Sequence, residues 1–188
     1  MQPTAFNDLH AVPWKNGGGV TRELACFPPG AGFDDFTWRI SIADVNATGP
    51  FSSFPGIDRI ITLLDGDGMR LEFSDCKLHG LTEKLLPFSF PGEAQVHAEL
   101  VGAPSRDFNL MLRRGRATGR VDVLRASGII ASNNMLIYCV GGRWRLGTEE
   151  CVLHAGDHVL LEGGMTGAKI DMLEPDGALL CVKINLTD

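Results

Sequence analysis

Hydrophobic and polar residues alternate along short runs of this chain, with the period of a β-strand that buries one face. In the run 36–43, Phe36, Trp38, Ile40 and Ile42 share one strand face, and polar residues occupy most of the other. Similar short runs rich in Val, Ile, Leu or Phe occur at 58–64, 69–74, 93–101, 107–113, 119–125, 135–140, 151–154, 158–162 and 178–186. No capped apolar pattern of helical period appears, so the sequence predicts an all-β protein in which helix is minor.

The spacing of these runs is typical of a sandwich or barrel, and the 23 glycines among 188 residues suit its many tight turns. Residues 60–71 resemble residues 135–146, because each segment contains an apolar strand, a glycine-containing turn and a second strand with a basic residue. We interpret this similarity as an internal duplication. The sequence therefore predicts two tandem β-barrel lobes, residues 1–116 with the ligand site and residues 117–188.

Composition narrows the class of protein. Hydrophobic residues make up 44% of the chain and charged residues 21%, which is enough apolar material for a core and argues against disorder. The net charge of −6 does not suit a protein that tracks nucleic-acid phosphates. No apolar run reaches the length of a membrane span, and the first residues do not resemble a signal peptide. We expect a soluble cytoplasmic protein with no nucleic-acid or membrane partner.

The five cysteines are scattered and form no C-x-x-C pair. Several have apolar neighbours, so we expect buried thiols in a reducing compartment rather than a zinc site or a disulfide framework.

The segment that ends at Gly66 resembles the first cupin motif, roughly G-x5-H-x-H-x3-4-E-x6-G, without its metal ligands. With the last glycine of the motif placed on Gly66, the glutamate position holds Arg59. The two histidine positions fall on Ser52 and Phe54, or on Ser53 and Pro55. Cupin metal chemistry needs imidazole and carboxylate ligands around one ion, so the sequence predicts no metal and no cofactor.

An arginine in place of a ligand carboxylate changes a cation site into a candidate anion site. Arginine is the side chain best suited to bidentate recognition of a carboxylate. The cupin overlay directs Arg59 into the barrel mouth, which favours a binding role. The alternative is that Arg59 pairs with Asp58 or another acid on the surface.

Two further strands carry a polar face. In the run 107–113, Asn109 and Arg113 alternate with apolar residues, and Arg39 and Ser41 do the same in the run 36–43. If these faces line a barrel interior, they suit a small polar ligand. The alternative is an ordinary solvated outer face.

Several motifs together resemble the HutD/Ves family of bicupin proteins. They are W-K-N-G-G-G-V-T-R-E-L at 14–24, W-R-I-S-I-A at 38–43, G-P-F-S-S-F-P-G-I-D-R at 49–59 and D-F-N-L-M-L-R-R at 107–114. The resemblance covers nearly the whole chain. It implies a metal-free bicupin of two jelly-roll lobes, commonly a homodimer, whose best-known members are associated with bacterial histidine utilisation and with a ligand such as N-formylglutamate.

Our leading hypothesis is a metal-independent bicupin that binds a small carboxylate, such as a formyl amino acid or a formate-like ion, and regulates histidine utilisation without catalysis. Arg59 would hold the carboxylate, with Asn109, Arg113, Arg39 and Ser41 completing the site. Trp14, Lys15 and Asn16 would also contribute, because Trp14 could form a wall and the other two side chains carry hydrogen-bond donors.

Two alternatives remain open at the level of sequence. The first is a metal-free cupin enzyme, an isomerase or a hydrolase, although no Ser/His/Asp or Cys/His arrangement is evident. The second is an interaction module without a ligand pocket. The glycine run Gly17–Gly19 fits a close approach to a ligand or to a neighbouring strand, or a plain tight turn.

Overall fold

The computed structural model describes residues 2–131, 134–147, 151–161 and 166–187, and this part of the chain consists of strands, turns and loops. The one helical segment in these ranges is the three-residue 3-10 helix η1 (Phe6–Asp8), which buries no residue. No helix of the described part is long and apolar enough to cross a membrane. The prediction of an all-β fold with little helix is therefore confirmed.

Contacts divide the chain into two compact units, described here one at a time. One contains residues 10–118 with Thr187, and the other contains residues 2–9 with 119–186. The sequence placed the change-over between residues 116 and 117, but it also assigned the first nine residues to the first lobe. The structure groups them with the later unit, because Thr4 forms a two-way backbone hydrogen-bonded bridge with His158.

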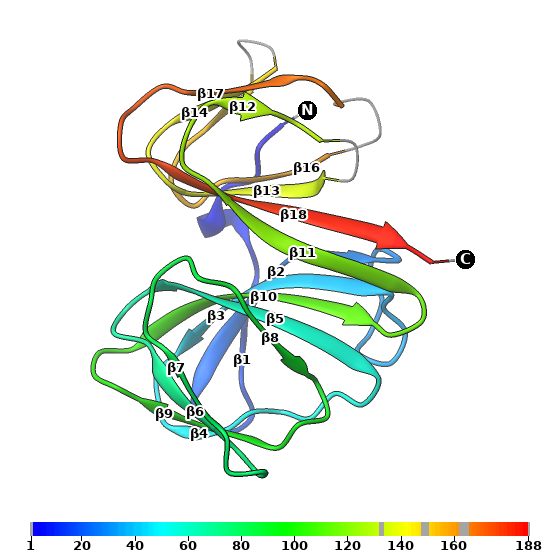
Figure 1. Ribbon diagram of the computed structural model, residues 1–188, viewed down its shortest axis with the longest axis vertical. Helices are drawn as coiled ribbons and strands as arrows, with labels where there is room; N and C mark the ends of the chain where they lie inside the picture. The colour runs from blue at the N-terminus through cyan, green and yellow to red at the C-terminus, as the bar shows by residue number, and fades with distance from the viewer. Residues whose placement is uncertain (1, 132–133, 148–150, 162–165, 188) are drawn as a thin grey trace. The chain divides into compact units, whose positions relative to one another are not determined.

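The unit of residues 10–118 contains two antiparallel sheets (Figure 1). The larger has the order β1-β2-β3-β10-β5-β8, with β1 (Ala11–Pro13), β2 (Gly19–Phe27), β3 (Trp38–Val45), β10 (Ser105–Arg113), β5 (Ile57–Asp65) and β8 (Phe88–Pro91). The smaller has the order β4-β9-β6-β7, with β4 (Gly49–Pro50), β9 (Val96–Leu100), β6 (Met69–Phe73) and β7 (Leu78–Leu81).

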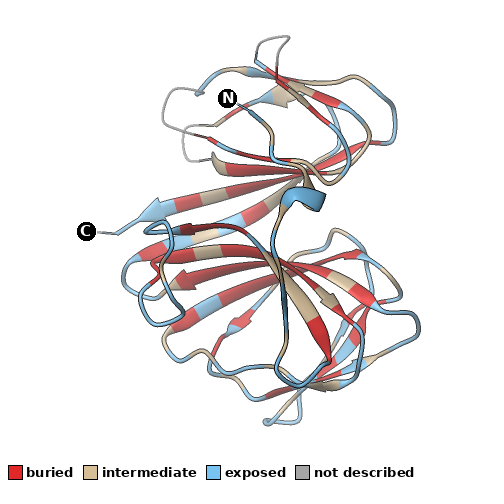
Figure 2. Ribbon diagram, turned by 180° about the vertical axis from the view of Figure 1, so that it is seen from behind, coloured by how far each residue is buried: buried red, intermediate tan, exposed pale blue. Residues whose placement is uncertain are grey.

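A hydrophobic core lies between these two sheets. Ile61 and Leu63 of β5 pack in it with Met69 and Leu71 of β6 and with Val96 of β9, so side chains from both sheets meet. The opposite face of the larger sheet is buried as well, since Ile40, Phe108 and Leu110 are fully inaccessible to solvent. Figure 2 shows this burial as long red stretches on the central strands.

The register of three adjacent strands determines which polar residues reach the core between the sheets. Asn109 of β10 lies opposite Ser41 of β3 and Ile61 of β5, and Met111 lies opposite Arg39 and Arg59. Residues directly opposite each other in neighbouring strands project from the same face. Because Ile61 belongs to the core, all of these side chains project from the interior face of the sheet.

The unit containing residues 119–186 also has two antiparallel sheets, each of four strands. One has the order β11-β18-β13-β16, with β11 (Ala117–Leu124), β18 (Ala178–Leu186), β13 (Asn134–Gly141) and β16 (His158–Leu160). The other has the order β12-β17-β14-β15, with β12 (Gly128–Ile129), β17 (Lys169–Met172), β14 (Trp144–Leu146) and β15 (Val152–Leu153). Trp144, Ile137, Leu153 and Leu179 are fully buried in its core.

Every run that the alternation pattern singled out contains a strand, although ends shift by a few residues. The last residue of the run 158–162 lies outside the described residues. The pattern missed several strands, among them β2, β7, β8 and β17. In β2 the polar residues Thr21, Arg22 and Glu23 stand together and interrupt the alternation.

Candidate functional site

Arg59 lies on the interior face of β5 and is only 8% exposed. Its Nη2 donates a hydrogen bond of 2.8 Å to Oδ1 of Asn109, which stands 50 positions later in the sequence on β10. Asn109 is also buried, so the solvated-face alternative for this residue is wrong. Two side chains that the sequence placed in one site are therefore in direct contact.

Three phenylalanine rings surround the Arg59 guanidinium. Its Cζ lies 4.9 Å from the ring centroid of Phe90, 5.3 Å from that of Phe51 and 5.5 Å from that of Phe54. A guanidinium at such distances is attracted to the electron-rich faces of aromatic rings. The sequence analysis missed these rings, although Phe51 and Phe54 lie within the motif that ends at Arg59.

Arg59 has no carboxylate within ion-pair distance among the described residues, and its buried Nε has no hydrogen-bond partner there. Asp58, the surface partner considered in the sequence, instead pairs with Arg114 at 2.9 Å. The ion-pair alternative for Arg59 and Asp58 is thus wrong. An unpaired buried charge costs several kcal/mol, roughly, before any compensation by polar contacts.

Burial, with a smaller contribution from the nearby positive charge of Arg39, lowers the pKa of Arg59 to about 10, and Asp107 opposes both effects. The guanidinium is still protonated at neutral pH. Its charge therefore acts in an environment of low polarity, where attraction to an anion is stronger than at the surface.

Arg39 and Ser41 lie next to this pair on β3. Arg39 Nε donates to Glu23 Oε2 at 2.7 Å, and Nη1 lies 3.5 Å from Ser41 Oγ. The guanidinium also covers the ring of Phe33 at 4.9 Å, and Phe33 is exposed. Ser41 is buried, so it too is not on a solvated face. Arg39 already has an acidic partner, whereas Arg59 has only an amide.

Asp107 is a residue that the sequence analysis did not assign to the site. It is completely buried on the same interior face as Asn109, and its Oδ1 accepts a hydrogen bond of 2.9 Å from Ser105 Oγ. Burial raises its pKa to about 7, with a smaller contribution from Asp44, and the Ser105 hydrogen bond and the charge of Arg59 oppose this rise. The alternation of the run 107–113 already placed Asp107 on this face and could have identified it.

Arg113 contacts backbone rather than the Arg59 group. Its Nε donates to the carbonyl oxygen of Phe36 at 2.7 Å, and its Nη2 donates to that of Asp34 at 2.8 Å. Its Cζ also lies 5.3 Å from the Phe36 ring centroid. These contacts hold the loop before β3 in place, and a ligand-binding role for Arg113 stays a prediction.

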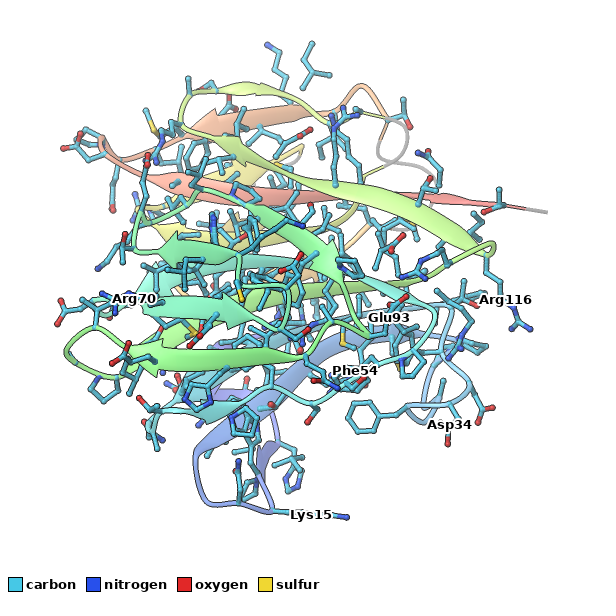
Figure 3. All side chains as sticks on the ribbon, turned by 60° about the horizontal axis from the view of Figure 1, so that its bottom comes forward. Lys15, Asp34, Phe54, Arg70, Glu93 and Arg116 are labelled. Carbon is cyan, nitrogen blue, oxygen red and sulfur yellow. The ribbon has the colours of Figure 1, made fainter. Side chains whose placement is uncertain are left out.

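The segment from Trp14 to Gly19 forms the turn of the hairpin β1–β2. Asn16 Oδ1 accepts a hydrogen bond from the Gly18 backbone, and a Cβ added to Gly19 would lie 3.0 Å from the Trp14 ring. Lys15 is exposed and projects from the hairpin tip, well apart from Phe54 (Figure 3). Gly17 has a positive φ of 70° in this turn, and a Cβ added to Gly19 would lie 2.5 Å from the backbone oxygen of Asp44 on β3, so the glycine run serves a tight turn and a close approach to a neighbouring strand. A ligand role for Lys15 and Asn16 stays a prediction.

Trp14 itself packs against the core between the sheets and donates from Nε1 to Thr21 Oγ1 at 2.7 Å. Trp14 therefore joins the hairpin to the interior.

Within the described ranges, no three His, Cys, Asp or Glu side chains come together in a group that could hold a metal ion. The chemistry of the site is thus that of a buried guanidinium, an amide and aromatic rings, which suits an anionic oxygen ligand.

Comparisons with known proteins agree with the motifs described above. The HutD family model matches residues 6–180. The chain belongs to the HutD/Ves family. Protein Ves of Citrobacter koseri is 37% identical over 190 residues, which cover 95% of this chain and 93% of that protein.

Solved structures place the HutD/Ves fold among the cupin-like folds. HutD from Pseudomonas fluorescens SBW25, solved in a formate condition, superposes with a TM-score of 0.83 at 30% identity and covers 99% of this chain and 98% of that one. A single-residue variant of oxalate decarboxylase from Bacillus subtilis has a TM-score of 0.65 at 8% identity, covering 99% of this chain and 77% of that chain. The second likeness concerns the fold alone.

Proposed function

We propose that this HutD/Ves protein binds a small carboxylate through Arg59, without a metal, and that binding rather than catalysis is its function. The single observation that carries the proposal is a buried guanidinium whose direct hydrogen-bond partner is the neutral side chain of Asn109. A ligand carboxylate would supply the missing negative charge. Hydrogen bonds between charged groups of this kind are stronger than those between neutral groups.

The aromatic surroundings support the same ligand class. Phe51, Phe54 and Phe90 offer no hydrogen-bond acceptors to Arg59, so the side chain keeps donors for an incoming oxygen. Arg39 adds a second positive charge nearby, although Glu23 partly neutralises it. A formyl amino acid such as N-formylglutamate, which carries carboxylates and a neutral formyl oxygen, fits this combination.

Calorimetric titration with N-formylglutamate tests the proposal, with formate and unmodified glutamate as further probes. The decisive comparison is between the unmodified protein and Arg59→Met. Arg70→Met is the matched control, because Arg70 is an exposed arginine of the same unit that pairs only with Glu99 in the described structure. We expect Arg59→Met to bind at least about tenfold more weakly, from the loss of a charged hydrogen bond, and Arg70→Met to bind normally. Equal binding by all three proteins would contradict the proposal.

We also propose that the protein acts in the cytoplasm as a homodimeric bicupin that regulates histidine utilisation in response to this ligand. Family membership supports the regulatory role, and two compact units with two antiparallel sheets each support two cupin lobes.

The regulatory role is tested in the host. Replacing the gene by one that encodes the Arg59→Met variant should change the expression of the histidine-utilisation genes in the same way as deleting the gene. If the protein is a homodimer, light scattering should give a mass near twice 20.3 kDa. A crystal structure would test whether each unit is a cupin lobe.

A metal-free enzyme is the second candidate, and one observation favours it. Asp107 has a pKa of about 7, which is the range in which a general acid or base is most effective. Nuclear magnetic resonance of N-formylglutamate during prolonged incubation with the protein separates the two candidates. An unchanged ligand spectrum supports binding without catalysis, and turnover that Asp107→Asn abolishes would establish the enzyme.

A further inference from the structure

Asp107 and Arg59 form a pair of oppositely charged groups on one interior face, but they are not an ion pair. Arg59 donates to Asn109 Oδ1, and Asp107 accepts from Ser105 Oγ, so each has a neutral partner. The second carboxyl oxygen of Asp107, Oδ2, is buried and has no hydrogen-bond partner among the described residues. The charge on Asp107 is therefore compensated only from a distance.

The surroundings of Asp107 limit what else can compensate it. In the register of the sheet it lies between Ala43 of β3 and Leu63 of β5, and the facing sheet contributes Met69, Leu71, Leu81, Val96 and Ala98 to the core. The charged groups that act on it are Arg59 on β5 and Asp44 on β3, and Arg39 on β3 acts on Arg59. On β7 the titratable group is His79, which is stacked on Phe88 with ring centroids 3.5 Å apart.

The charged groups shift the pKa of Asp107 in opposite directions. Asp44 repels a charge on Asp107, whereas Arg59 attracts it. Glu23 already pairs with Arg39 at 2.7 Å. Burial lowers the pKa of His79, which leaves this ring uncharged at neutral pH. After the Ser105 hydrogen bond, Arg59 is the charged group that favours an ionised Asp107, so a change in the charge at Arg59 should change the protonation of Asp107.

We propose that Asp107 is the proton-linked partner of Arg59, so that a carboxylate binding at Arg59 enters together with one proton, which Asp107 takes up. This inference rests on the proposed function. A bound carboxylate adds a negative charge to the same interior, which offsets the charge of Arg59 and disfavours an ionised Asp107. The proton comes from solvent and adds to the carboxylate of Asp107, and no other bond changes.

The coupling gives ligand affinity a defined dependence on pH. The carboxylates of N-formylglutamate are ionised throughout the range between pH 6 and pH 9, roughly, so the ligand itself does not titrate there. The pKa of Asp107 in the free protein is about 7. Below this value Asp107 is protonated before and after binding, and affinity is constant. Above it, binding requires proton uptake, and affinity falls by up to about tenfold per pH unit.

The test is calorimetric titration of N-formylglutamate at about pH 8 in Tris and in HEPES, which differ in their enthalpy of ionisation. The difference in binding heat between the two buffers measures proton uptake, which should approach one per bound ligand. In Asp107→Asn the uptake should disappear, and affinity should no longer fall between pH 7 and pH 9, roughly. Asp75→Asn is the matched control, because Asp75 is exposed and pairs with Lys77, and it should keep the uptake.

A second measurement follows Asp107 directly in the unmodified protein and does not depend on how the variant folds. Carbon NMR of the aspartate carboxyl groups should show one group that titrates near neutrality without ligand and at higher pH with N-formylglutamate. Binding without proton uptake, or an Asp107 carboxyl with an ordinary aspartate pKa, would overturn this inference alone. Absence of any carboxylate binding would overturn the proposed function and, with it, this inference.

Discussion

The interiors of the two units differ in how many buried polar and charged residues they contain. Of eight buried polar or charged residues in the described part of the chain, seven lie within residues 10–118, and His158 is the one in the other unit. Val159 of β16 packs in the hydrophobic core of the unit of residues 119–186. Because neighbouring residues of a strand face opposite sides, His158 projects away from that core. One interior thus contains Arg59, Asn109 and Asp107, whereas the other contains Trp144, cysteines and aliphatic side chains.

The difference shows which unit has charged groups in its interior. Apolar burial stabilises the unit of residues 119–186, and His158 is the one buried polar or charged residue among the described residues of this unit. The unit of residues 10–118 gives up part of that stabilisation to keep a buried cation and a buried acid.

The largest expected effect comes from the apolar interior. Trp144 is fully buried, and its Nε1 donates to the carbonyl oxygen of Gly141 at 3.0 Å. Trp144→Ala should lower the free energy of unfolding by about 3–5 kcal/mol, since it leaves a large cavity. Urea denaturation measures this change. A loss below about 1 kcal/mol would mean that this core is loosely packed and that the contrast with the polar interior is weaker.

Asp107→Asn should change how stability depends on pH. The folded-state pKa is about 7 against an ordinary value of 3.8, so between these values the folded state holds more protons than the unfolded state. The free energy of unfolding therefore falls as pH rises through this window and is level above it. Urea denaturation between about pH 4.5 and pH 8 should show that Asp107→Asn removes up to about 3 kcal/mol of this fall. An unchanged pH profile would contradict the raised pKa.

The polar interior can also be made to resemble the apolar one. Replacing Arg59 by Met and Asn109 by Leu together removes a buried charge and the side chain to which it donates a direct hydrogen bond. Apolar replacement of buried charged groups is often neutral or stabilising by about 1–4 kcal/mol. We expect thermal unfolding at the same or a higher temperature, with N-formylglutamate binding lost. Marked destabilisation would show that the pair serves the fold rather than a ligand.

The smallest effect concerns the hairpin tip. Lys15 is exposed on the turn between β1 and β2. Lys15→Ala should change the free energy of unfolding by less than about 0.5 kcal/mol, and the affinity for N-formylglutamate should remain the same in calorimetry. Tenfold weaker binding would instead support the ligand role that the sequence predicted for this residue.

The interior site was partly predictable. The cupin overlay identified Arg59, and strand alternation identified Asn109 and Ser41, because these signals depend on spacing along a single segment. Asp107 was on the predicted face but was not selected, since its chemical significance comes from complete burial beside Arg59. The role of Arg113 could not be predicted, because its partners are backbone carbonyl oxygens of a loop far away in the sequence.

The sequence by itself determined the all-β class, the family and the two faces of strands such as β10, since all three follow from local periodicity and motifs. Tertiary structure alone decided that both faces of β10 are buried, as Phe108 and Asn109 show. It also decided that Arg59 meets an amide across 50 positions of sequence rather than the adjacent Asp58. The physical reason is that burial and pairing depend on which strands lie side by side, and strand order is a property of the folded chain.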